Sequence, residues 1–554
     1  MNKQFFKNLL NFDIKNSSIA LAGTFLFFGF INTLLPIISF TFHSQIKSFF
    51  FPLSVGLSIL FLLGSFYFLI GKEKFLKYTF WGSIIFFVAV VKSYLISGYF
   101  YDVSWDGQMY HQEAIIQLVN GWNPIFAKLT DNQHDWILNH YAKASWYAGA
   151  SVYAFCGKIE NGKLFTWLFM AASFLLSFVA IKEVAKISFL KTAFFAFLLA
   201  FNPITANQTL SYYIDGQLAS LLLSLISIFI LIFQKQNKSY LFLLMFFIIS
   251  VFVNLKFTAL GYAGILCIGF ALIFLVQKQY ALFLKHSILM FFIGIFAVVF
   301  IGYNPYVTNT VNHQHPFFPL NTMDLLTGQI PSNFENQNRF YKLYHSTFSE
   351  AGAFWREQTI LKFPFDISDF KAFKQADSRI SGFGSLFGAT VIITALLFFY
   401  LLRKGRGKKF HLIWISLAII IFSAMVNPEV WWARYVPQLY FIPVFVALLM
   451  EVVEKNKVIK IFYFAHLVAL VLNIGIIVWV YYPYNYKSTK EINAQIENLK
   501  EKELEVFFQT FTANHTRFLE NNIKYHQIDS IGALTCPEPE RLSGSQLTVF
   551  CVKN

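Results

Sequence analysis

Long apolar runs separated by short polar connections dominate the chain. A helix needs about 20 mostly apolar residues to cross the hydrocarbon core of a bilayer. By that measure the sequence predicts thirteen membrane-spanning helices, with the runs at 188–204 and 239–254 the weakest. The predicted spans are 17–40, 50–71, 78–99, 162–181, 188–204, 212–233, 239–254, 258–276, 286–303, 383–402, 410–426, 435–452 and 459–482. The pattern therefore predicts an all-α polytopic membrane protein.

Two connections are long, 100–161 and 304–382, and they hold many of the acidic, His, Asn and Trp residues. Apolar positions at helical spacing predict an amphipathic helix over 107–120, ending at Gly121, that lies flat on the membrane surface. We expect a second surface helix over 136–155, with Trp146 and Tyr147 at the interface.

The end of the chain differs from the rest. A charged helical pattern runs from Glu491 to Glu520, and β-like runs follow at 525–528 and 547–552. This order predicts a small α/β unit. We expect a transmembrane domain over 1–482 and an appendage over 483–554.

Composition supports a membrane protein, because 56% of the 554 residues are hydrophobic and only 13% are charged. The net charge of +15 does not indicate nucleic-acid binding, since Lys and Arg alternate between connections and do not share one face. The positive-inside rule places these basic connections and the N-terminus in the cytoplasm. The two long loops and the tail then lie outside, and the short cytoplasmic loops leave no room for a nucleotide-binding domain.

Of the four cysteines, Cys536 and Cys551 both lie in the outward tail. In an oxidising compartment they are expected to form a disulfide, although spacing alone leaves two free thiols as an alternative. Cys267 lies in an apolar span and reads as a packing residue.

The polar stretch from Tyr101 to Glu113 follows the third span directly and contains Asp102, Asp106 and His111. Carboxylates at the mouth of a membrane bundle cost solvation energy unless they have a partner or a task. Either catalysis or an N-cap for the following helix accounts for Asp106.

The residues Asp106-Gly107-Gln108-Met109-Tyr110-His111-Gln112-Glu113-Ala114, followed by Gly121-Trp122-Asn123-Pro124, resemble a motif of the GT-C glycosyltransferases. In the aminoarabinose and protein-mannosyl transferase branches this motif is Asp-Glu-x-x-Tyr-x-x-x-Ala, then Gly, Trp and Pro. The resemblance implies a GT-C-like bundle over roughly residues 80–450, with Asp106 as the catalytic carboxylate and Tyr110 at the donor site. Gly107 departs from the motif, where those branches have Glu. The departure leaves open whether Asp102 or Glu113 supplies a second acidic group.

Two cations stand on the outer side of the predicted bundle. Lys256 breaks the charge bias, and Arg434 opens the twelfth span with a guanidinium that can bind phosphate through two hydrogen bonds. The resemblance implies that both contact a lipid phosphate, together with Asp215 at the mouth of the sixth span. The alternatives are snorkelling for Lys256, an ion pair with Glu429 for Arg434 and a helix cap for Asp215.

Histidines in the two long loops are the remaining candidates. Their spacing is not diagnostic of a metal site, so no metal ligands are predicted, and participation of a divalent cation stays open. His313 is a candidate contact for the lipid phosphate, and Lys143 is a weaker one. The histidines and the neighbouring acid are His134, Asp135, His140, His313 and His315.

These observations lead to an expectation of function. The chain is expected to be an inverting glycosyltransferase that acts on the outer face of a bacterial cytoplasmic membrane. It would move a sugar from a polyprenyl-phosphate donor to a hydroxyl group on a lipid, glycan or protein. The alternatives are a transporter or flippase for lipid-linked sugars, and a glycan polymerase or ligase with a diphosphate-linked donor.

Overall fold

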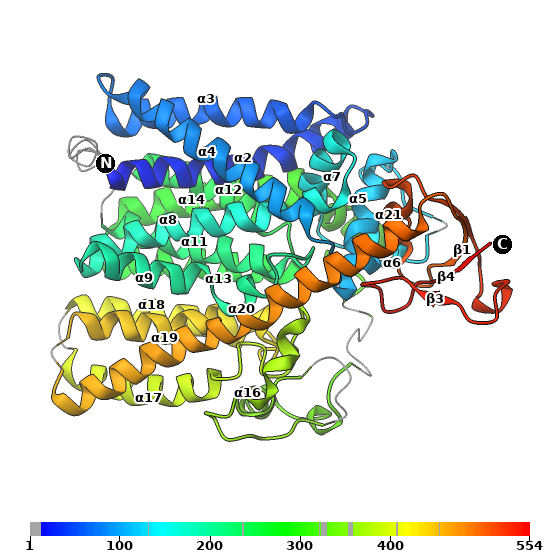
Figure 1. Cartoon of the computed structure of the whole chain (residues 1–554). Coiled ribbons are helices and arrows are strands. Elements are labelled where there is room, and N and C mark those ends of the chain that lie inside the picture. Colours follow the sequence, from blue (N-terminus) through cyan, green and yellow to red (C-terminus); the bar gives the residue numbers. More distant parts are fainter. Residues whose placement is uncertain are drawn as a thin grey trace, which may run out of the picture.

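The computed structural model describes residues 13–130, 132–234, 238–320, 322, 329–352, 358–405, 408–453 and 455–553. Long helices lie side by side in a bundle, and a small domain with a β-sheet stands at one end of it (Figure 1). The N-terminus lies at the opposite end of the bundle from the C-terminus.

Within the described residues, nine helices are long and apolar enough to cross a membrane. They are α2 (Ile14–Thr41), α3 (Phe50–Ile70), α4 (Phe75–Tyr99), α8 (Phe165–Ala185, continuous with a turn that starts at Ile159), α11 (Asp215–Phe233), α13 (Phe257–Val276), α14 (Tyr280–Ile295, continuous with a π-helical turn that ends at Ile301), α17 (Phe387–Lys404) and α20 (Lys457–Leu499). The other four predicted spans coincide with shorter apolar helices, α9 (Phe189–Ala200), α12 (Lys238–Phe252), α18 (Lys408–Met425) and α19 (Gln438–Glu451). The chain is therefore a mostly helical, multi-pass membrane protein.

The helices divide into inner and outer ones. α11 is buried along nearly its whole length, whereas α3 and α4 expose large apolar side chains such as Leu60, Phe68 and Phe80. Exposed apolar surface of this extent suits contact with lipid. On the buried helix, Ser220 and Ser224 donate hydrogen bonds to backbone carbonyls one turn earlier, which satisfies their hydroxyl groups without water.

The first long loop is helical, but it does not lie exposed on the membrane surface. Its helix begins as a π-helical turn and continues as an α-helix, and His111, Gln112 and Glu113 are at most 2% exposed. The prediction that this helix lies on the surface with an exposed polar face is therefore wrong. The rest of the first long loop covers His111 and Gln112 through Trp146 and Glu160, and the C-terminal domain covers Glu113 through Thr512. The elements are η1 (Gly107–His111), α5 (Gln112–Val119), α6 (Asp135–Leu138), α7 (Ala144–Cys156) and η2 (Ile159–Leu164).

The second predicted surface helix is also different. It splits into α6 and α7, and Trp146 and Tyr147 are buried where α7 packs against α2 and α5. An interfacial role for these two rings is therefore wrong. Gly121 has φ +105° just after α5, as predicted for the residue that ends this helix.

Short helices fill the remaining connections. They are α10 (Pro203–Ala206), η3 (Phe296–Ile301), η4 (Tyr303–Val307), α15 (Thr308–His313), η5 (Ser332–Phe334), α16 (Arg339–Phe348), η6 (Ser368–Lys374) and η7 (Ala433–Tyr435). Most of them belong to the second long loop, between α14 and α17.

The C-terminal domain begins without a break, because α20 continues past residue 482 to Leu499. Its four-stranded sheet has the order β2-β1-β4-β3, with β1 and β2 parallel and the other pairs antiparallel. The helical pattern predicted from Glu491 to Glu520 is wrong in its middle part, where strand β1 follows Leu499, and helical turns return only at 512–519. The elements are β1 (Glu503–Phe507), η8 (Thr512–Asn514), α21 (His515–Leu519), β2 (Lys524–Gln527), η9 (Ile531–Ala533), β3 (Glu540–Arg541) and β4 (Val549–Val552).

The predicted disulfide is confirmed. Cys536 and Cys551 are bonded, with their Cα atoms 5.8 Å apart, and the bond joins the segment after β2 to strand β4.

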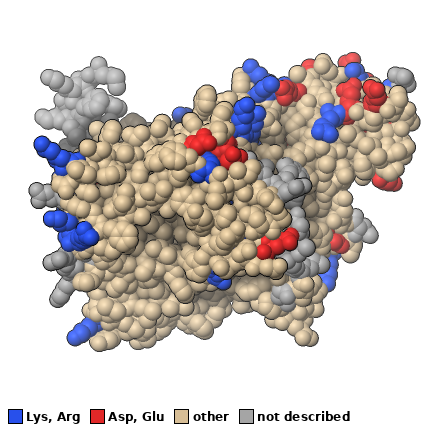
Figure 2. Space-filling view, turned by 90° about the horizontal axis from the view of Figure 1, so that it is seen from below, with Lys and Arg blue, Asp and Glu red and all other residues tan. Residues whose placement is uncertain are grey.

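Charged side chains are unevenly distributed along the molecule. On the face in Figure 2, the end of the bundle opposite the C-terminal domain shows Lys and Arg, whereas the middle and the C-terminal domain show Asp and Glu together with further Lys and Arg. This distribution is the one that the positive-inside rule associates with a cytoplasmic N-terminal end.

Candidate active site

A cavity of about 540 Å³ lies where the ends of the helices, the two long loops and the C-terminal domain meet. Its wall contains residues separated by more than 400 positions, so it exists only in the folded chain. The lining includes Asp102, Val103, Ser104, Trp105, Asp106, Met109, Tyr110, Trp136, Tyr213, Lys374, Gln375, Asp377, Arg379, Trp432, Arg434, Tyr435, Tyr484, Asn485, Thr510, Gly544, Ser545 and Gln546.

Arg434 lies in this wall at the centre of a charged cluster, of which Asp106 and Asp377 also line the cavity and Asp215 and Lys256 do not. Its guanidinium lies 3.1 Å from Asp106, 3.4 Å from Asp377 and 3.6 Å from Asp215. Lys256 Nζ contacts the other oxygen of Asp215 at 2.8 Å. The sequence thus brings together five charged residues from five segments, and four of them were predicted as site residues.

Aromatic rings enclose the cations. The guanidinium carbon of Arg434 is 4.5 Å from the ring centre of Trp432 and 4.9 Å from that of Tyr213, and Lys256 Nζ is 3.8 Å from that of Tyr435. Rings that exclude water strengthen the ion pairs beside them. Burial lowers the pKa of Arg434, but Asp377 and Asp106 outweigh that effect and hold it above the usual value, so the group stays charged.

The carboxylate of Asp106 faces the cavity. Its Oδ2 accepts hydrogen bonds from Tyr110 Oη and Arg434 Nη1, both at 3.1 Å. No side-chain cap joins Asp106 to the following turn, where Ser104 Oγ instead accepts from Gly107 N. The N-cap alternative for Asp106 is therefore wrong, and Tyr110 contacts the predicted catalytic carboxylate.

Asp102 has a different environment although it also borders the cavity. Its two oxygens accept from the backbone N–H groups of Ser104 and Tyr212, at 2.8 and 2.7 Å. Burial raises the pKa of Asp102 to about 6, and the nearby Lys163 acts in the opposite direction. These contacts fix the course of the loop before Asp106. They give Asp102 a positioning function and leave no contact with the Arg434 cluster.

Glu113 lies away from the cavity. It is buried and accepts from Gln117, Asn132 and Thr512, so it joins the first long loop to the C-terminal domain. The structure thus places the two candidates for a second acidic group, Asp102 and Glu113, outside the charged cluster.

His313 and Lys143 are not part of the cavity wall either. The His313 ring stacks on Phe318 at 3.8 Å and lies near His140, and Lys143 Nζ donates to the carbonyl of Tyr141 at 2.8 Å. Their predicted role at a lipid phosphate has no supporting contact here. In the part of the chain that the structure describes, no three His, Cys, Asp or Glu residues are grouped to hold a metal ion.

Sequence reasoning missed Asp377 and Arg379 in the second long loop. Asp377 accepts from Trp432 Nε1 at 2.9 Å, and the guanidinium of Arg379 lies 4.3 Å from the Trp432 ring centre. Trp432, which contacts both of these side chains, is 1% exposed. The alternative partner of Arg434, Glu429, instead accepts a hydrogen bond from Trp431 Nε1. The sequence did contain a signal for these two residues, because Asp377 and Arg379 carry opposite charges two positions apart in a long polar loop.

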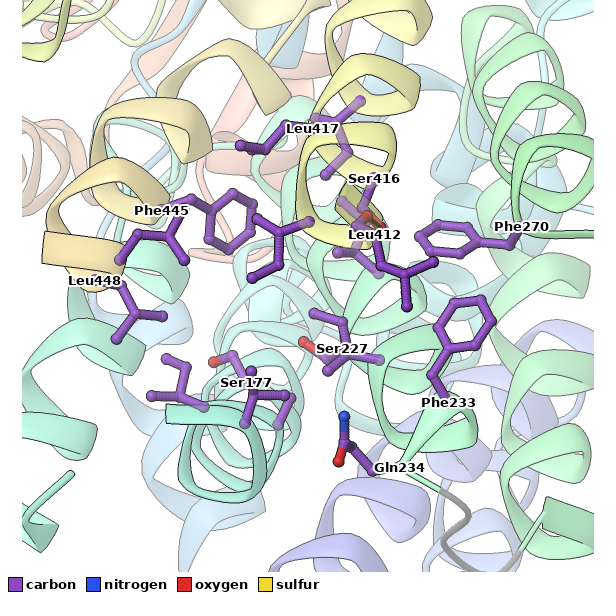
Figure 3. Close-up of a pocket in the computed structure, with 18 of the residues that line it drawn as sticks. Ser177, Ser227, Phe233, Gln234, Phe270, Leu412, Ser416, Leu417, Phe445 and Leu448 are labelled. Carbon is purple, nitrogen blue, oxygen red and sulfur yellow. Dashed lines mark hydrogen bonds between the residues drawn. The ribbon is translucent and has the colours of Figure 1, made fainter. Parts of the chain in front are cut away.

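A second cavity of about 200 Å³ lies at the other end of the bundle. Figure 3 shows Phe233, Phe270 and Phe445 turned toward it from α11, α13 and α19. Asp215 begins α11 and Phe233 ends it, about 27 Å apart along the helix axis. The residues that line this cavity include no titratable group, so acid–base chemistry belongs to the charged cavity.

In comparisons with known proteins, no family model and no curated protein matches this chain.

Proposed function

We propose that this protein is an inverting glycosyltransferase of a bacterial cytoplasmic membrane, with its active site on the outer face. A polyprenyl-phosphate sugar is the donor, and a hydroxyl group is the acceptor. The observation that carries the proposal is the pairing of one cavity-facing carboxylate, Asp106, with the buried cation Arg434 at the end of an apolar bundle.

The proposed reaction uses these two groups directly. The acceptor oxygen attacks C1 of the sugar while its proton passes to Asp106, and the bond between C1 and the phosphate oxygen breaks. The phosphate keeps the electron pair of that bond, and Arg434 stabilises its charge. A single base suits displacement with inversion, and transfer requires that base within hydrogen-bond reach of the hydroxyl group.

Arg434 has donor capacity left for an anion. Within the described residues its Nε–H group makes no hydrogen bond, although the side chain is only 11% exposed and Asp377 lies 3.4 Å away. A buried donor without an acceptor costs about 1 to 3 kcal/mol, which a phosphate oxygen can recover. Lys256 does not line the cavity and acts through Asp215, whose charge it balances.

The position of the charges favours transfer over transport. Transporter sites usually lie near the middle of the membrane, between broken helices. Here Asp215 stands at the first residue of α11, and Asp106, Asp377 and Arg434 lie in connections outside the spans.

The test uses purified protein in lipid nanodiscs. Donors are decaprenyl-phosphate-linked glucose, mannose, galactose and aminoarabinose, and the acceptor hydroxyl comes from water or from an added lipid, glycan or peptide. The readout is release of decaprenyl phosphate, which reports cleavage whichever hydroxyl takes the sugar. Asp106→Asn should lower release about 100-fold or more because the base is lost, and it should bind decaprenyl phosphate at least as well as the wild type. Asp529→Asn, at an exposed loop position, is the matched control.

Binding of decaprenyl phosphate tests the cation. Arg434→Gln should weaken it at least tenfold, whereas Arg541→Gln on the exposed strand β3 should not. Unchanged donor cleavage in Asp106→Asn would exclude this carboxylate as the base. Stronger binding of decaprenyl diphosphate, with no cleavage of any phosphate-linked sugar, would instead favour a polymerase or ligase.

A further inference from the structure

The side chains that line the cavity fall into two groups: one half carries the charged cluster around Arg434, and the other half has a different chemical character. This second half is formed by the C-terminal domain, the part of α20 around Tyr484, and both long loops. The side chains there are amides, hydroxyl groups and aromatic rings: Trp105, Trp136, Lys374, Gln375, Tyr484, Asn485, Thr510, Ser545 and Gln546.

The loop Ser543–Gln546 is firmly attached to the segment that carries Asp106. Gln108, two residues after Asp106, donates to Gly544 O at 3.0 Å, and Asn514 donates to both Gln108 and Ser545. Arg517 donates to Ser543 O and Asp102 O, at 2.9 and 3.0 Å. This network holds the C-terminal wall at a fixed position relative to the proposed base, as a second substrate would require.

The charged side chains that line the cavity are largely balanced without a ligand. Asp106 and Asp377 pair with Arg434, and both oxygens of Asp102 accept backbone hydrogen bonds. Among the described residues of this half, Lys374 is the charged one, and its Nζ lies 5.8 Å from the ring centre of Tyr484. A ligand with several phosphate groups would find one cation there.

The rings are accessible. Trp136 is 37% exposed and Tyr484 is 36% exposed, although both border the cavity. A pyranose ring presents an apolar C–H face and a rim of hydroxyl groups. Aromatic faces can pack against the first, and amide groups can both donate to and accept from the second.

We propose that this half of the cavity is the acceptor subsite and that it takes an uncharged saccharide. The inference rests on the proposed function, because it assigns the second substrate of the same reaction. The C-terminal domain then forms part of the active site, with Gln546 and Trp136 on opposite segments contacting the acceptor sugar.

The experiment measures binding to the full chain in nanodiscs by saturation-transfer NMR. The probes are maltotetraose, cellotetraose and chitotetraose as neutral saccharides, an oligomer of glycerol phosphate as an anionic acceptor, a serine- and threonine-rich peptide, and decaprenyl phosphate. At least one neutral saccharide should bind saturably and more tightly than the glycerol phosphate oligomer and the peptide. Trp136→Ala and Gln546→Ala should each weaken that binding about tenfold and leave decaprenyl phosphate binding unchanged.

Matched controls come from exposed positions away from the cavity. Trp479→Ala, at a residue 70% exposed on α20, and Gln527→Ala on β2 should leave saccharide binding as in the wild type. Saccharide binding that neither Trp136→Ala nor Gln546→Ala changes would overturn the acceptor subsite, as would tighter binding of the anionic oligomer or the peptide, or no saccharide binding. With decaprenyl phosphate binding intact in those cases, the proposed function would stand. Failure of the wild type to bind decaprenyl phosphate would reject the proposed function itself.

Discussion

At the scale of single residues, the side chains packed around Gly107 explain why this position of the motif holds glycine. A Cβ atom at this position would overlap the carboxylate of Asp102 and approach Ser104 Oγ at 2.6 Å. The glycosyltransferase motif that this stretch resembles has Glu at this position. In this chain the side chain of Asp102 fills the space that a Glu side chain would need. Close packing therefore requires glycine at position 107. The Asp102 carboxylate that fills this space binds two backbone N–H groups and does not contact the Arg434 cluster.

Gly107→Ala should destabilise the protein by about 1 to 3 kcal/mol, because the new methyl group forces apart a buried, hydrogen-bonded loop. The matched control is Gly261→Ala in α13, where a Cβ atom meets nothing within 4 Å and a helical Gly-to-Ala change stabilises by up to about 1 kcal/mol. Thermal unfolding in detergent compares the two. Equal melting temperatures for both variants would contradict the packing argument.

The charged residues of the site were predictable to different degrees. Four of them lie next to apolar spans, where an ionised side chain costs solvation energy and therefore needs a partner or a function. These four, Asp106, Asp215, Lys256 and Arg434, could be predicted for that reason. Asp377 lies in a long polar loop, where an ionised carboxylate stays hydrated and has no unfavourable solvation energy that would mark it as functional. Only the fold shows that it reaches Arg434.

At the scale of elements, the apolar runs predicted the helices well, because the bilayer sets their length and composition. The exposure of α5 and α7 was not predictable from periodicity. A polar residue such as Glu113 is buried when Thr512 of the distant C-terminal domain donates to it. Strand β1 was mistaken for helix because its charged neighbours favour helix locally, whereas pairing with β2 and β4 decides its conformation.

The contact between α21 and η2 gives a prediction for pH dependence. Glu520 accepts from Ile159 N at 2.8 Å, and burial raises its pKa from 4.5 to about 7. The folded state therefore binds this proton more tightly than the unfolded state. The stability that it contributes is complete at low pH and is lost as the pH rises from about 4.5 to about 7.

Glu520→Gln keeps the acceptor for Ile159 and cannot ionise. At about pH 8 the variant should be more stable than the wild type by about 1 to 3 kcal/mol, and at about pH 4 the difference should vanish. Melting temperatures across this range provide the measurement, with the exposed Glu538→Gln as control. A variant that is less stable than the wild type at about pH 8 would show that the ionised carboxylate is favoured in the fold.

At the scale of the whole molecule, the C-terminal domain is joined to the membrane bundle through the same residues that shape the cavity. Arg517 is 3% exposed and donates to Ser543 O and Asp102 O, so one side chain connects the two walls. Tyr101 belongs to the apolar core of the C-terminal domain, together with Ile492 and Leu504. The cavity is therefore stable only while this domain is docked.

Arg517→Met removes both hydrogen bonds and keeps much of the apolar volume. Each bond from a charged group is worth about 1.5 to 3 kcal/mol, so local opening of the cavity wall should become at least tenfold more frequent. Hydrogen exchange should therefore accelerate together in segments 102–108 and 543–546, and donor cleavage should fall. Arg541→Met, on the exposed strand β3, should change neither. Faster exchange in 543–546 alone would mean that the domain loosens without disturbing the loop of Asp106, and docking would then not be what keeps the proposed base in place.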